Sequence, residues 1–597
     1  MELLNLDGVI EKGVFEIPSY QRGYAWQDRQ LEDFWNDLEH VSKLGDKFHY
    51  MHSLTLRESE NEFESSAFEI IDGQQRLATS LILLGLLAKI TQNKDPKYSL
   101  INLEPILSYK YYGLSEAFRA ITEEEKDLEA FKTSFYAKNL IDAYAFFKEK
   151  ISDTPVGTLE KMFDALIKKM LFSVVGLNDN RIDPFSSFET INNRGKDLST
   201  LELLKNRLHF VAHKICDEGD LENLQNEIND TYTRIYHNLR FFKDDHLEDF
   251  LKYFVAYYYG EKRDFKERLL NTAFDAHKKY DDLYDEYEKI NDLLLHLSYS
   301  SKVWYFLHTL DDEELRIEIT PKMRDLLDKM RRLNALSYNA FLPLLLSLLT
   351  IQLAVRSGSE RHYTTKELEG LLEYLERFGF LIYGVADGKK TAKNEWIELA
   401  FKAIQAYRFW GDKITIEDLP TLEKNFFKGK YSGLELLEES IHSKKNAEKW
   451  YRWGKALNYL LYEYELRHNP ETTLNFDSSI ESIEHILPQN PDQGYSAKEK
   501  NWAKNPNIVH ALGNLLLIPK NANSSLSNKP FEEKRKAYLK GSYSEKEVAK
   551  NASFGIVEIQ KRSEKLLDFL IARYRIAELV GENAIKAFKN ALLKEIK

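Results

Sequence analysis

Two short stretches near the end of the chain hold side chains that suit acid–base and metal chemistry. Glu484 and His485 stand together in IEHILPQ, and Asn514 and Asn523 follow, nine residues apart, in LGNLLLIPKNANSSLSNKP. A histidine with an ordinary pKa of about 6.5 can take a proton from water near neutral pH. Carboxylate and amide oxygens are the ligands that Mg²⁺ and Mn²⁺ prefer. We therefore expect a site in which a base and a metal ion act together.

Each of these residues has an expected role and an ordinary structural alternative. His485 is the candidate base and Asn523 the candidate metal ligand, while Asn514 can fix two strands and orient the His485 ring through a backbone contact. Side chains alternate along a strand, so Glu484 points away from His485 unless the strand is kinked or bulged. Taken singly, His485 also fits a strand histidine, and asparagines often form turns.

The order of these residues resembles that of HNH-type ββα-metal nucleases. An acid–His pair on one strand is followed by an asparagine on the next strand and another on a helix. The resemblance implies hydrolysis of phosphodiesters, with His485, Asn514 and Asn523 as catalytic residues. It also implies Mg²⁺ or Mn²⁺ bound through Glu484 and Asn523, because a divalent cation neutralises charge on the phosphorane and the leaving oxygen.

The chain departs from the wider HNH pattern in two respects. The last ligand is an asparagine, not a histidine, and Asn521 and Asn528 are rival candidates for that position. The chain has one cysteine, Cys216, which can form neither an internal disulfide nor a Cys-clustered zinc site.

A basic stretch surrounds the candidate site. From residue 498 to residue 540 there are nine Lys or Arg residues and three acids, in a chain whose net charge is −12. A local basic face is where nucleic-acid phosphates would be expected, and we expect Lys529, Lys534 and Arg535 to contact DNA. The alternative is a solvated helix face.

Three polar motifs lie in the first 210 residues. They are the YQR motif IPSYQRGYAWQ (17–27), the DGQQR motif FEIIDGQQRLATSLILLGLL (68–87) and the NNRG motif FETINNRGKDLSTLELLKNRL (188–208). In the structural interpretation, Asp72 caps a helix with Gln75 at the reciprocal capping-box position. Ser199 and Glu202 form a second S-x-x-E box, and residues 192–195 form a turn.

The same motifs also suit an anion site. A strand that ends in a glycine turn and opens a helix points backbone N–H groups at the turn. Arg22 and Arg76 can each grip a phosphate with two hydrogen bonds. Asp72 repels phosphate, so we expect it to hold a metal ion, orient an arginine or position water. The segment GVADGKKT lacks the glycine–lysine spacing of a Walker loop.

Together the motifs resemble GmrSD-type, modification-dependent (type IV) restriction systems. The resemblance implies an N-terminal ParB/sulfiredoxin-like domain that binds or hydrolyses an NTP, or senses modified DNA. The implied site residues are Asp72, Gly73, Gln74, Gln75 and Arg76, then Tyr20, Gln21 and Arg22, and finally Asn192 and Gly195. The segments LLYEYELR and IEHILPQ and the asparagine-rich stretch after them resemble the HNH-like C-terminal domain of the same family.

The elements that must position these residues indicate an α+β, mostly α-helical chain. Apolar spacing predicts a helix after Asp28, strands at SLTL, FEII and LFSVVGL, and a small strand–loop–strand–helix arrangement around IEHI and LGNLLLIP. We expect an N-terminal α/β domain (1–210), a helical connecting domain (211–443) and a nuclease domain (444–597). The apolar stretch 340–355 is too short to span a bilayer, and we interpret it as a core helix.

We expect a cytoplasmic restriction endonuclease that defends against phage. It would nick or cut foreign or modified double-stranded DNA, and an NTP or the modification itself would regulate it through the N-terminal domain. The expected partners are DNA and an NTP, with no membrane, and a homodimer is left open. One alternative is an NTPase, or a nucleotide-regulated protein, whose C-terminal module only binds DNA; another is a helical scaffold without enzymatic activity.

Overall fold

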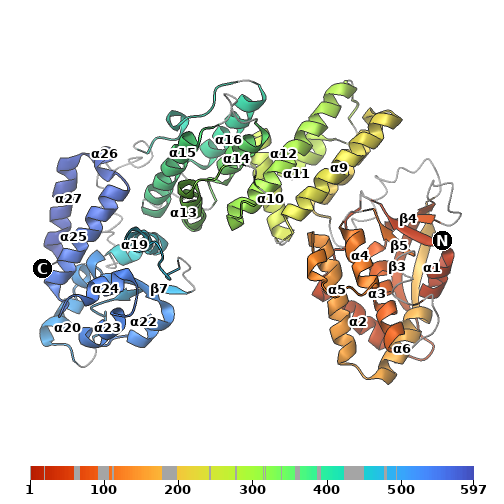
Figure 1. Ribbon diagram of the computed structural model, residues 1–597, viewed down its shortest axis with the longest axis horizontal. Helices are drawn as coiled ribbons and strands as arrows, with labels where there is room; N and C mark the ends of the chain where they lie inside the picture. The colour runs from red at the N-terminus through yellow and green to blue at the C-terminus, as the bar shows by residue number, and fades with distance from the viewer. Residues whose placement is uncertain are drawn as a thin grey trace. The chain divides into compact units, whose positions relative to one another are not determined.

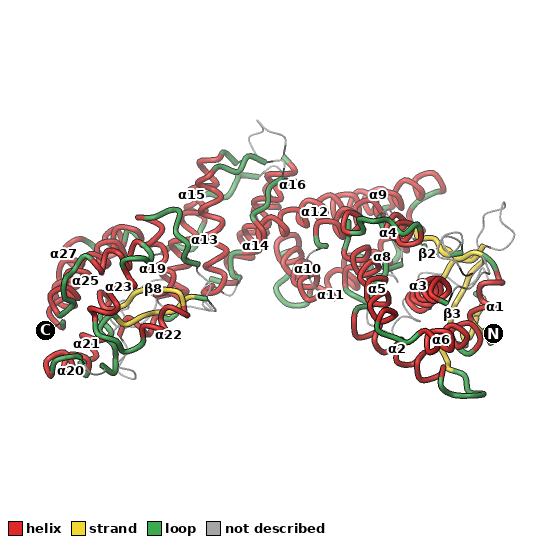
Figure 2. Tube along the Cα trace, turned by 60° about the horizontal axis from the view of Figure 1, so that its bottom comes forward, coloured by secondary structure: helices red, strands yellow, loops and turns green. Residues whose placement is uncertain are grey.

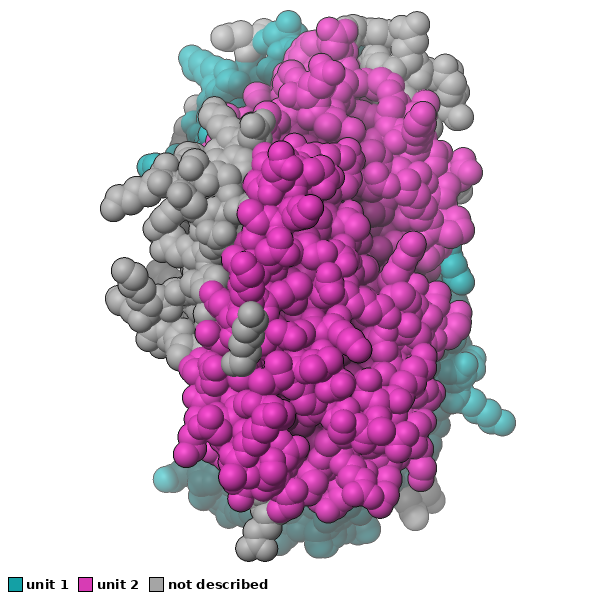
Figure 3. Space-filling model, turned by 90° about the vertical axis from the view of Figure 1, so that its left-hand side faces the viewer, with its two compact units in different colours: residues 1–306, 313–315 teal, residues 307–312, 316–597 magenta. Residues whose placement is uncertain are grey.

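The computed structural model describes most of the chain and divides it into two compact units. It describes residues 2–596 apart from 19–20, 59–66, 92–97, 99–105, 111–112, 178–197, 241, 243, 276–277, 281, 314, 316, 338, 356–362, 386–391, 410, 423–448, 476–479 and 492–493. Unit 1 comprises residues 1–306 and 313–315, and unit 2 comprises residues 307–312 and 316–597 (Figure 3). The expected boundaries near residues 210 and 443 stay predictions.

Unit 1 is built on a six-stranded mixed sheet, whose strands are yellow in Figure 2. The strand order is β1 (Glu2–Asn5), β6 (Met170–Gly176), β3 (His49–Glu58), β4 (Ala67–Asp72), β2 (Val14–Ile17) and β5 (Leu107–Tyr109). β1 pairs with β6 and β3 pairs with β4 in antiparallel fashion, whereas the other neighbours are parallel. The three expected strands are present as β3, β4 and β6.

Helices pack around this sheet. They are α1 (Leu6–Lys12), α2 (Asp28–Ser42), α3 (Gln74–Ile90), α4 (Leu114–Thr122), the short 3₁₀ helix η3 (Glu129–Phe131), α5 (Phe135–Ser152) and α6 (Val156–Lys168). Nearly every residue of α3 is buried, because α5 and α6 both pack on it (Figure 1). The predicted helix after Asp28 is confirmed as α2, which buries its apolar positions at helical spacing.

The rest of the described part of unit 1 is mainly helical, as expected. Its elements are α8 (Thr200–Ile215), α9 (Glu218–Asn238), α10 (Asp244–Tyr259), α11 (Phe265–Glu267), the π-helical turn η4 (Arg268–Ala273) and α12 (Leu283–Thr309), whose last three residues belong to unit 2. Ser199 and Glu202 form the predicted reciprocal capping box at the start of α8. Each satisfies backbone or side-chain donors of the other, so this helix begins where the sequence pattern places it.

Unit 2 begins with a helical cluster. Its elements are α13 (Pro321–Ser337), α14 (Leu342–Ala354), α15 (Thr365–Phe378), the π-helical segment η5 (Gly379–Val385), α16 (Lys393–Arg408) and the 3₁₀ helix η6 (Ile416–Asp418). The apolar stretch around α14 is a buried core helix, as expected, and packs on α16. Every helix in the described ranges is too short or too polar to cross a bilayer.

The second part of unit 2 carries the small sheet. Its elements are η7 (Lys449–Trp453), α19 (Lys455–His468), β7 (Glu481–His485), α20 (Ala497–Ala503), α21 (Pro506–Val509), η8 (Leu512–Asn514), β8 (Leu515–Pro519), α22 (Lys520–Leu526), α23 (Phe531–Tyr538), α24 (Tyr543–Ala549), α25 (Ile556–Arg573), α26 (Ile576–Val580) and α27 (Glu582–Glu595). β7 and β8 pair antiparallel and α22 follows, which confirms the strand–loop–strand–helix arrangement and the mostly helical α+β class.

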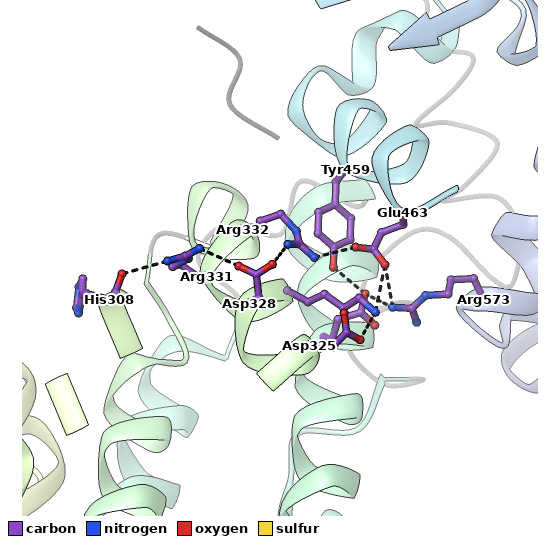
Figure 4. Close-up of polar contacts among 10 residues, drawn as sticks. His308, Asp325, Asp328, Arg331, Arg332, Tyr459, Glu463 and Arg573 are labelled. Carbon is purple, nitrogen blue, oxygen red and sulfur yellow. Dashed lines mark hydrogen bonds and ion pairs between the residues drawn. The ribbon is translucent and has the colours of Figure 1, made fainter. Parts of the chain in front are cut away.

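A buried network of charges joins four helices of unit 2 (Figure 4). Glu463 of α19, which is 3 % exposed, accepts from Arg332 of α13 at 3.1 Å and lies 3.5 Å from Arg573 of α25. Arg573 also pairs with Glu376 of α15 at 2.9 Å, and Tyr459 donates to the same carboxylate. Burial raises the pKa of Glu376 although Arg573 opposes the shift. The positive charges of Arg332 and Arg573 offset the negative charges of the buried Glu463 and Glu376 carboxylates.

We predict that Glu463→Ala destabilises unit 2. The change leaves Arg332 and Arg573 short of a buried counter-charge, and breaking a buried ion pair costs about 3–5 kcal/mol. Thermal and urea unfolding of the full chain would show a lower midpoint for the transition of unit 2. The control is Glu373→Ala, because Glu373 pairs with Lys322 on the surface. An unchanged midpoint for Glu463→Ala would contradict this account of the network.

Candidate functional sites

His485 stands at the end of β7 in a pocket of rings. Its Nε2 lies 3.1 Å from Nδ1 of His510, and the Tyr451 ring lies over both imidazoles at centroid distances of 5.0 and 5.8 Å. The amide nitrogen of Gln489 is 3.4 Å from each ring nitrogen of His485. Burial, with smaller contributions from His510 and Lys534, lowers the pKa of His485 to about 3. His485 is therefore neutral at physiological pH, with a lone pair on one of its ring nitrogens.

His510 was missed by the sequence analysis. It follows the four-residue helix α21 as its C-cap residue, outside any periodic apolar pattern. The one available signal was its position four residues before Asn514 in HALGN. Spacing alone did not show that a residue 25 positions after His485 would contact its ring.

Asn514 holds the two histidine-bearing segments together. It is fully buried, and its amide Nδ2 donates to the carbonyl oxygens of Leu487 at 2.9 Å and Val509 at 2.7 Å. Its Oδ1 accepts from the Leu487 N–H at 2.8 Å, and its own carbonyl oxygen accepts from the Ile486 N–H. Leu487 lies two residues after His485 and Val509 directly precedes His510. Asn514 thus contacts the backbone near both histidines, and its catalytic role stays a prediction.

Helix α25 in turn holds the segment around Asn514. Arg562 Nη1 donates to the carbonyl oxygens of Gly513 and Leu515 at 2.9 and 2.7 Å, and the Gly513 N–H donates to Ser563 Oγ at 2.8 Å. A Cβ atom on Gly513 would lie 2.1 Å from the carbonyl oxygen of Ile559. This contact between backbones is possible only for glycine, because any side chain would force the helix and the turn apart.

Glu484 and Lys534 form a buried ion pair beneath β7. Lys534 is fully buried, and its Nζ donates to Glu484 Oε1 at 2.5 Å and to the carbonyl oxygens of His485 at 2.9 Å and Ile486 at 3.3 Å. Tyr538 donates to the same carboxylate at 3.1 Å. Burial raises the pKa of Glu484 and lowers that of Lys534, because each charge loses hydration.

Two expectations change with this pair. Lys534, expected on the DNA-binding face, is instead inside the unit, where its three hydrogen bonds leave no contact for a phosphate. Glu484, expected to be a metal ligand, points away from His485 toward Lys534 and Tyr538, as strand alternation anticipated. This Glu484 carboxylate is already neutralised, so it does not fit a metal site in this arrangement.

Asn523, the other expected metal ligand, lies against β7. Its Nδ2 donates to Ser482 Oγ at 2.8 Å and to the Ile483 carbonyl oxygen at 3.1 Å, which ties α22 to β7. The Oδ1 atom of Asn523, the atom a hard cation would bind, is used in neither bond. The rival Asn521 spends its Oδ1 on the N–H of Ala522. Within the described ranges, no three His, Cys, Asp or Glu side chains gather as a metal cluster.

The two other expected DNA-binding residues differ in their surroundings. The Lys529 side chain is exposed next to the turn between α22 and α23. Arg535 is partly buried, and its Nε donates to the Ala549 carbonyl oxygen at 2.8 Å, so part of its guanidinium holds α24 in place. Lys529 is thus the exposed member of the three expected DNA contacts.

The YQR and DGQQR motifs meet in unit 1. Gln75 Nε2 donates to the Gly23 carbonyl oxygen at 2.8 Å, and its Oε1 accepts from the Ala25 N–H at 2.8 Å. Gln21 donates from its side chain to the Ile70 carbonyl oxygen, and Tyr24 hydrogen-bonds Thr79 at 2.6 Å. The two motifs lie close together, as expected. The side chains of Gln21 and Gln75 are used in hydrogen bonds to the backbone that hold the loop after β2 in place.

Asp72 and Arg76 flank the start of α3. Arg76 Nη2 lies 3.1 Å from Asp72 Oδ2 and donates to the Ser53 carbonyl oxygen at 2.7 Å, and Ser53 Oγ also donates to Asp72. Gly73, in a left-handed conformation with φ of +101°, is the N-cap residue. The expected capping box of Asp72 and Gln75 is therefore wrong, because the glycine turn places Asp72 on the strand and no side chain caps the helix.

The structure describes only some of the other residues expected to bind a ligand in unit 1. Gln74 and Arg22 are described and buried. Tyr20, Asn192 and Gly195 lie outside the described residues. The described end of the NNRG motif reaches the same region, because Glu202 accepts from Tyr136 at 2.5 Å, and a Cβ on Gly23 would lie 2.6 Å from the Tyr136 Cβ.

Comparison with protein families assigns both ends of the chain. Residues 3–209 match the GmrSD restriction endonuclease N-terminal domain, and residues 437–569 match the GmrSD restriction endonucleases C-terminal domain. Comparison with curated proteins gives no match. The matches place the chain in the class of restriction endonucleases, for which DNA is the partner. Within that class the chain belongs to the GmrSD family.

We predict that two lysines of the basic stretch differ in what their substitution changes, stability for one and DNA binding for the other. Lys534→Met leaves the Glu484 carboxylate buried without a counter-charge, so it should lower stability by about 3–5 kcal/mol. Lys529→Met removes an exposed charge, so it should leave the unfolding midpoint unchanged and weaken DNA binding, with a shallower dependence on salt. Calorimetry and a binding titration at several salt concentrations measure both. A normal midpoint for Lys534→Met would contradict the buried pair.

Proposed function

We propose that this chain hydrolyses phosphodiester bonds of foreign or modified DNA in a metal-dependent reaction at the His485 site. The observation that carries the proposal is a buried, neutral histidine at the end of the first strand of a strand–loop–strand–helix arrangement. Membership of the restriction endonuclease family supplies DNA as the substrate. The arrangement resembles that of HNH nucleases, which supports the proposed type of site.

The reaction follows from the residues at the site. A water molecule attacks the phosphorus, and its proton passes to the neutral His485 imidazole. The oxygen of the broken ester leaves as an alkoxide, which takes a proton from solvent. A bound Mg²⁺ or Mn²⁺ would neutralise the charge that develops on the phosphate, and Asn523 Oδ1 is the ligand that fits it. Lys534 holds the carbonyl oxygens of residues 485 and 486 and so fixes the backbone that carries the base.

The start of α3 is the proposed regulatory site. The first N–H groups of a helix have no partner within the helix, and no side chain caps them here. Arg76 stands beside them, with 23 % of its side chain exposed, and is paired with Asp72. We propose that an NTP phosphate or a phosphate of modified DNA binds this end and competes with Asp72 for Arg76. Binding or hydrolysis there would regulate the His485 site.

We predict that His485→Ala strongly slows cleavage. Without the imidazole no group at the end of β7 takes the proton from water, and loss of a general base costs about 10²–10⁴-fold in rate. The assay measures nicking and linearisation of plasmid DNA in Mg²⁺ or Mn²⁺. His468→Ala is the control, because His468 stacks on Tyr543 in the same unit. Undiminished cleavage by His485→Ala would refute the assignment of the base.

We predict that Arg76→Ala removes the response to nucleotide while leaving the His485 chemistry intact. The experiment is a cleavage panel with unmodified, base-modified and phosphorothioate DNA, with and without each NTP. Arg57→Ala is the matched control, because Arg57 pairs with Glu69 on the neighbouring strands β3 and β4. If wild type and Arg76→Ala respond identically to every NTP and every modification, the proposed regulatory site is wrong. NTP turnover without DNA cleavage by the wild type would instead favour a nucleotidase.

A further inference from the structure

The close approach of two imidazoles is the feature that the proposed reaction leaves unused. Nε2 of His485 and Nδ1 of His510 are 3.1 Å apart, which is hydrogen-bonding distance, and the two rings are inclined at 76°. A neutral imidazole carries its proton on one nitrogen and a lone pair on the other. One of the two rings must therefore donate and the other must accept.

We propose that His510 is a positioning residue of the nuclease site, whose Nδ1 accepts a hydrogen bond from the Nε2–H of His485. The inference rests on the proposed function, because it assigns the group that orients the proposed base. In this arrangement the proton of His485 stays on Nε2, and its Nδ1 keeps the lone pair that takes the proton from water. His510 thereby fixes both the ring and its tautomer, as a carboxylate does for the base in many hydrolases.

Gln489 supplies a donor beside the same ring. Its amide nitrogen, which is a donor only, lies 3.4 Å from each ring nitrogen of His485. A donor at equal distance from both nitrogens can bind whichever of them carries the lone pair. With the proton of His485 on Nε2 and directed at His510 Nδ1, the Gln489 amide is left to bind Nδ1.

Packing holds the two rings at this spacing. Tyr451 covers both rings, and its ring lies nearly parallel to that of His510 at an angle of 25°. The Asn514 amide binds the carbonyl oxygens of Leu487 and Val509, so one side chain sets the separation of the backbones that carry His485 and His510. The hydrogen bond between the histidines thus belongs to a rigid frame.

The test replaces His510 in the full-length protein and measures plasmid cleavage over a range of DNA and Mg²⁺ concentrations. H510A removes the acceptor and should lower kcat by about 10- to 100-fold, with KM and the half-saturating Mg²⁺ concentration unchanged. H510N and H510D place an oxygen where Nδ1 stands, and both should recover most of the kcat. H510D is decisive, because an ionised aspartate can only accept. Calorimetry of each variant separates loss of folding from loss of orientation.

Three outcomes would overturn the assignment. A wild-type kcat for H510A would show that His510 is not needed to orient the base. A slow H510D beside a fast H510N would make His510 the donor. A raised half-saturating Mg²⁺ concentration for H510A would make it a metal ligand. H485A, assayed in parallel, separates this inference from the proposed function. An inactive H485A with a normal H510A would refute only the role of His510. A fast H485A or an inactive wild type would refute the proposed function.

Discussion

The hydrogen bonds of the Asn514 amide are the constraint on which the C-terminal site depends. Every polar atom of this fully buried side chain is used, and each partner is a backbone group within two residues of His485 or His510. A buried amide that lost one of these bonds would carry the full cost of its desolvation, so the arrangement has little freedom to drift. The strand end and the turn before β8 are therefore held in register by one residue.

Buried charge plays a comparable part on the other side of β7. A lysine with no exposed surface is costly unless its charge is paired and all its protons are bonded, and Lys534 meets both conditions. In unit 2 the Glu463 network follows the same rule on a larger scale, with carboxylates and guanidinium groups from four helices. Charged residues in this chain are thus parts of the interior as well as of the surface.

Periodic patterns predicted the elements of the fold well, because they depend on local packing. The strands β3, β4 and β6, the core helix α14 and the Ser199–Glu202 box all follow from residues close in sequence. Two of the failures involve contacts that no local pattern encodes. Lys534 resembled a surface cation until its partner, 50 residues away, was known, and His510 had no pattern around it. Asp72 was misjudged because the glycine turn, not the carboxylate, begins α3.

The contact between Gly513 and α25 bears on how the protein can be divided. The carbonyl oxygen of Ile559 touches the position where a Cβ would stand on Gly513, and Arg562 binds the carbonyl oxygens on both sides of Asn514. A fragment that ended before Ile556 would retain both strands and every proposed catalytic side chain. It would still lack the scaffold that shapes the turn between His510 and β8. A fragment that keeps this turn in shape must therefore extend at least through α25, beyond the last side chain proposed to take part in the chemistry.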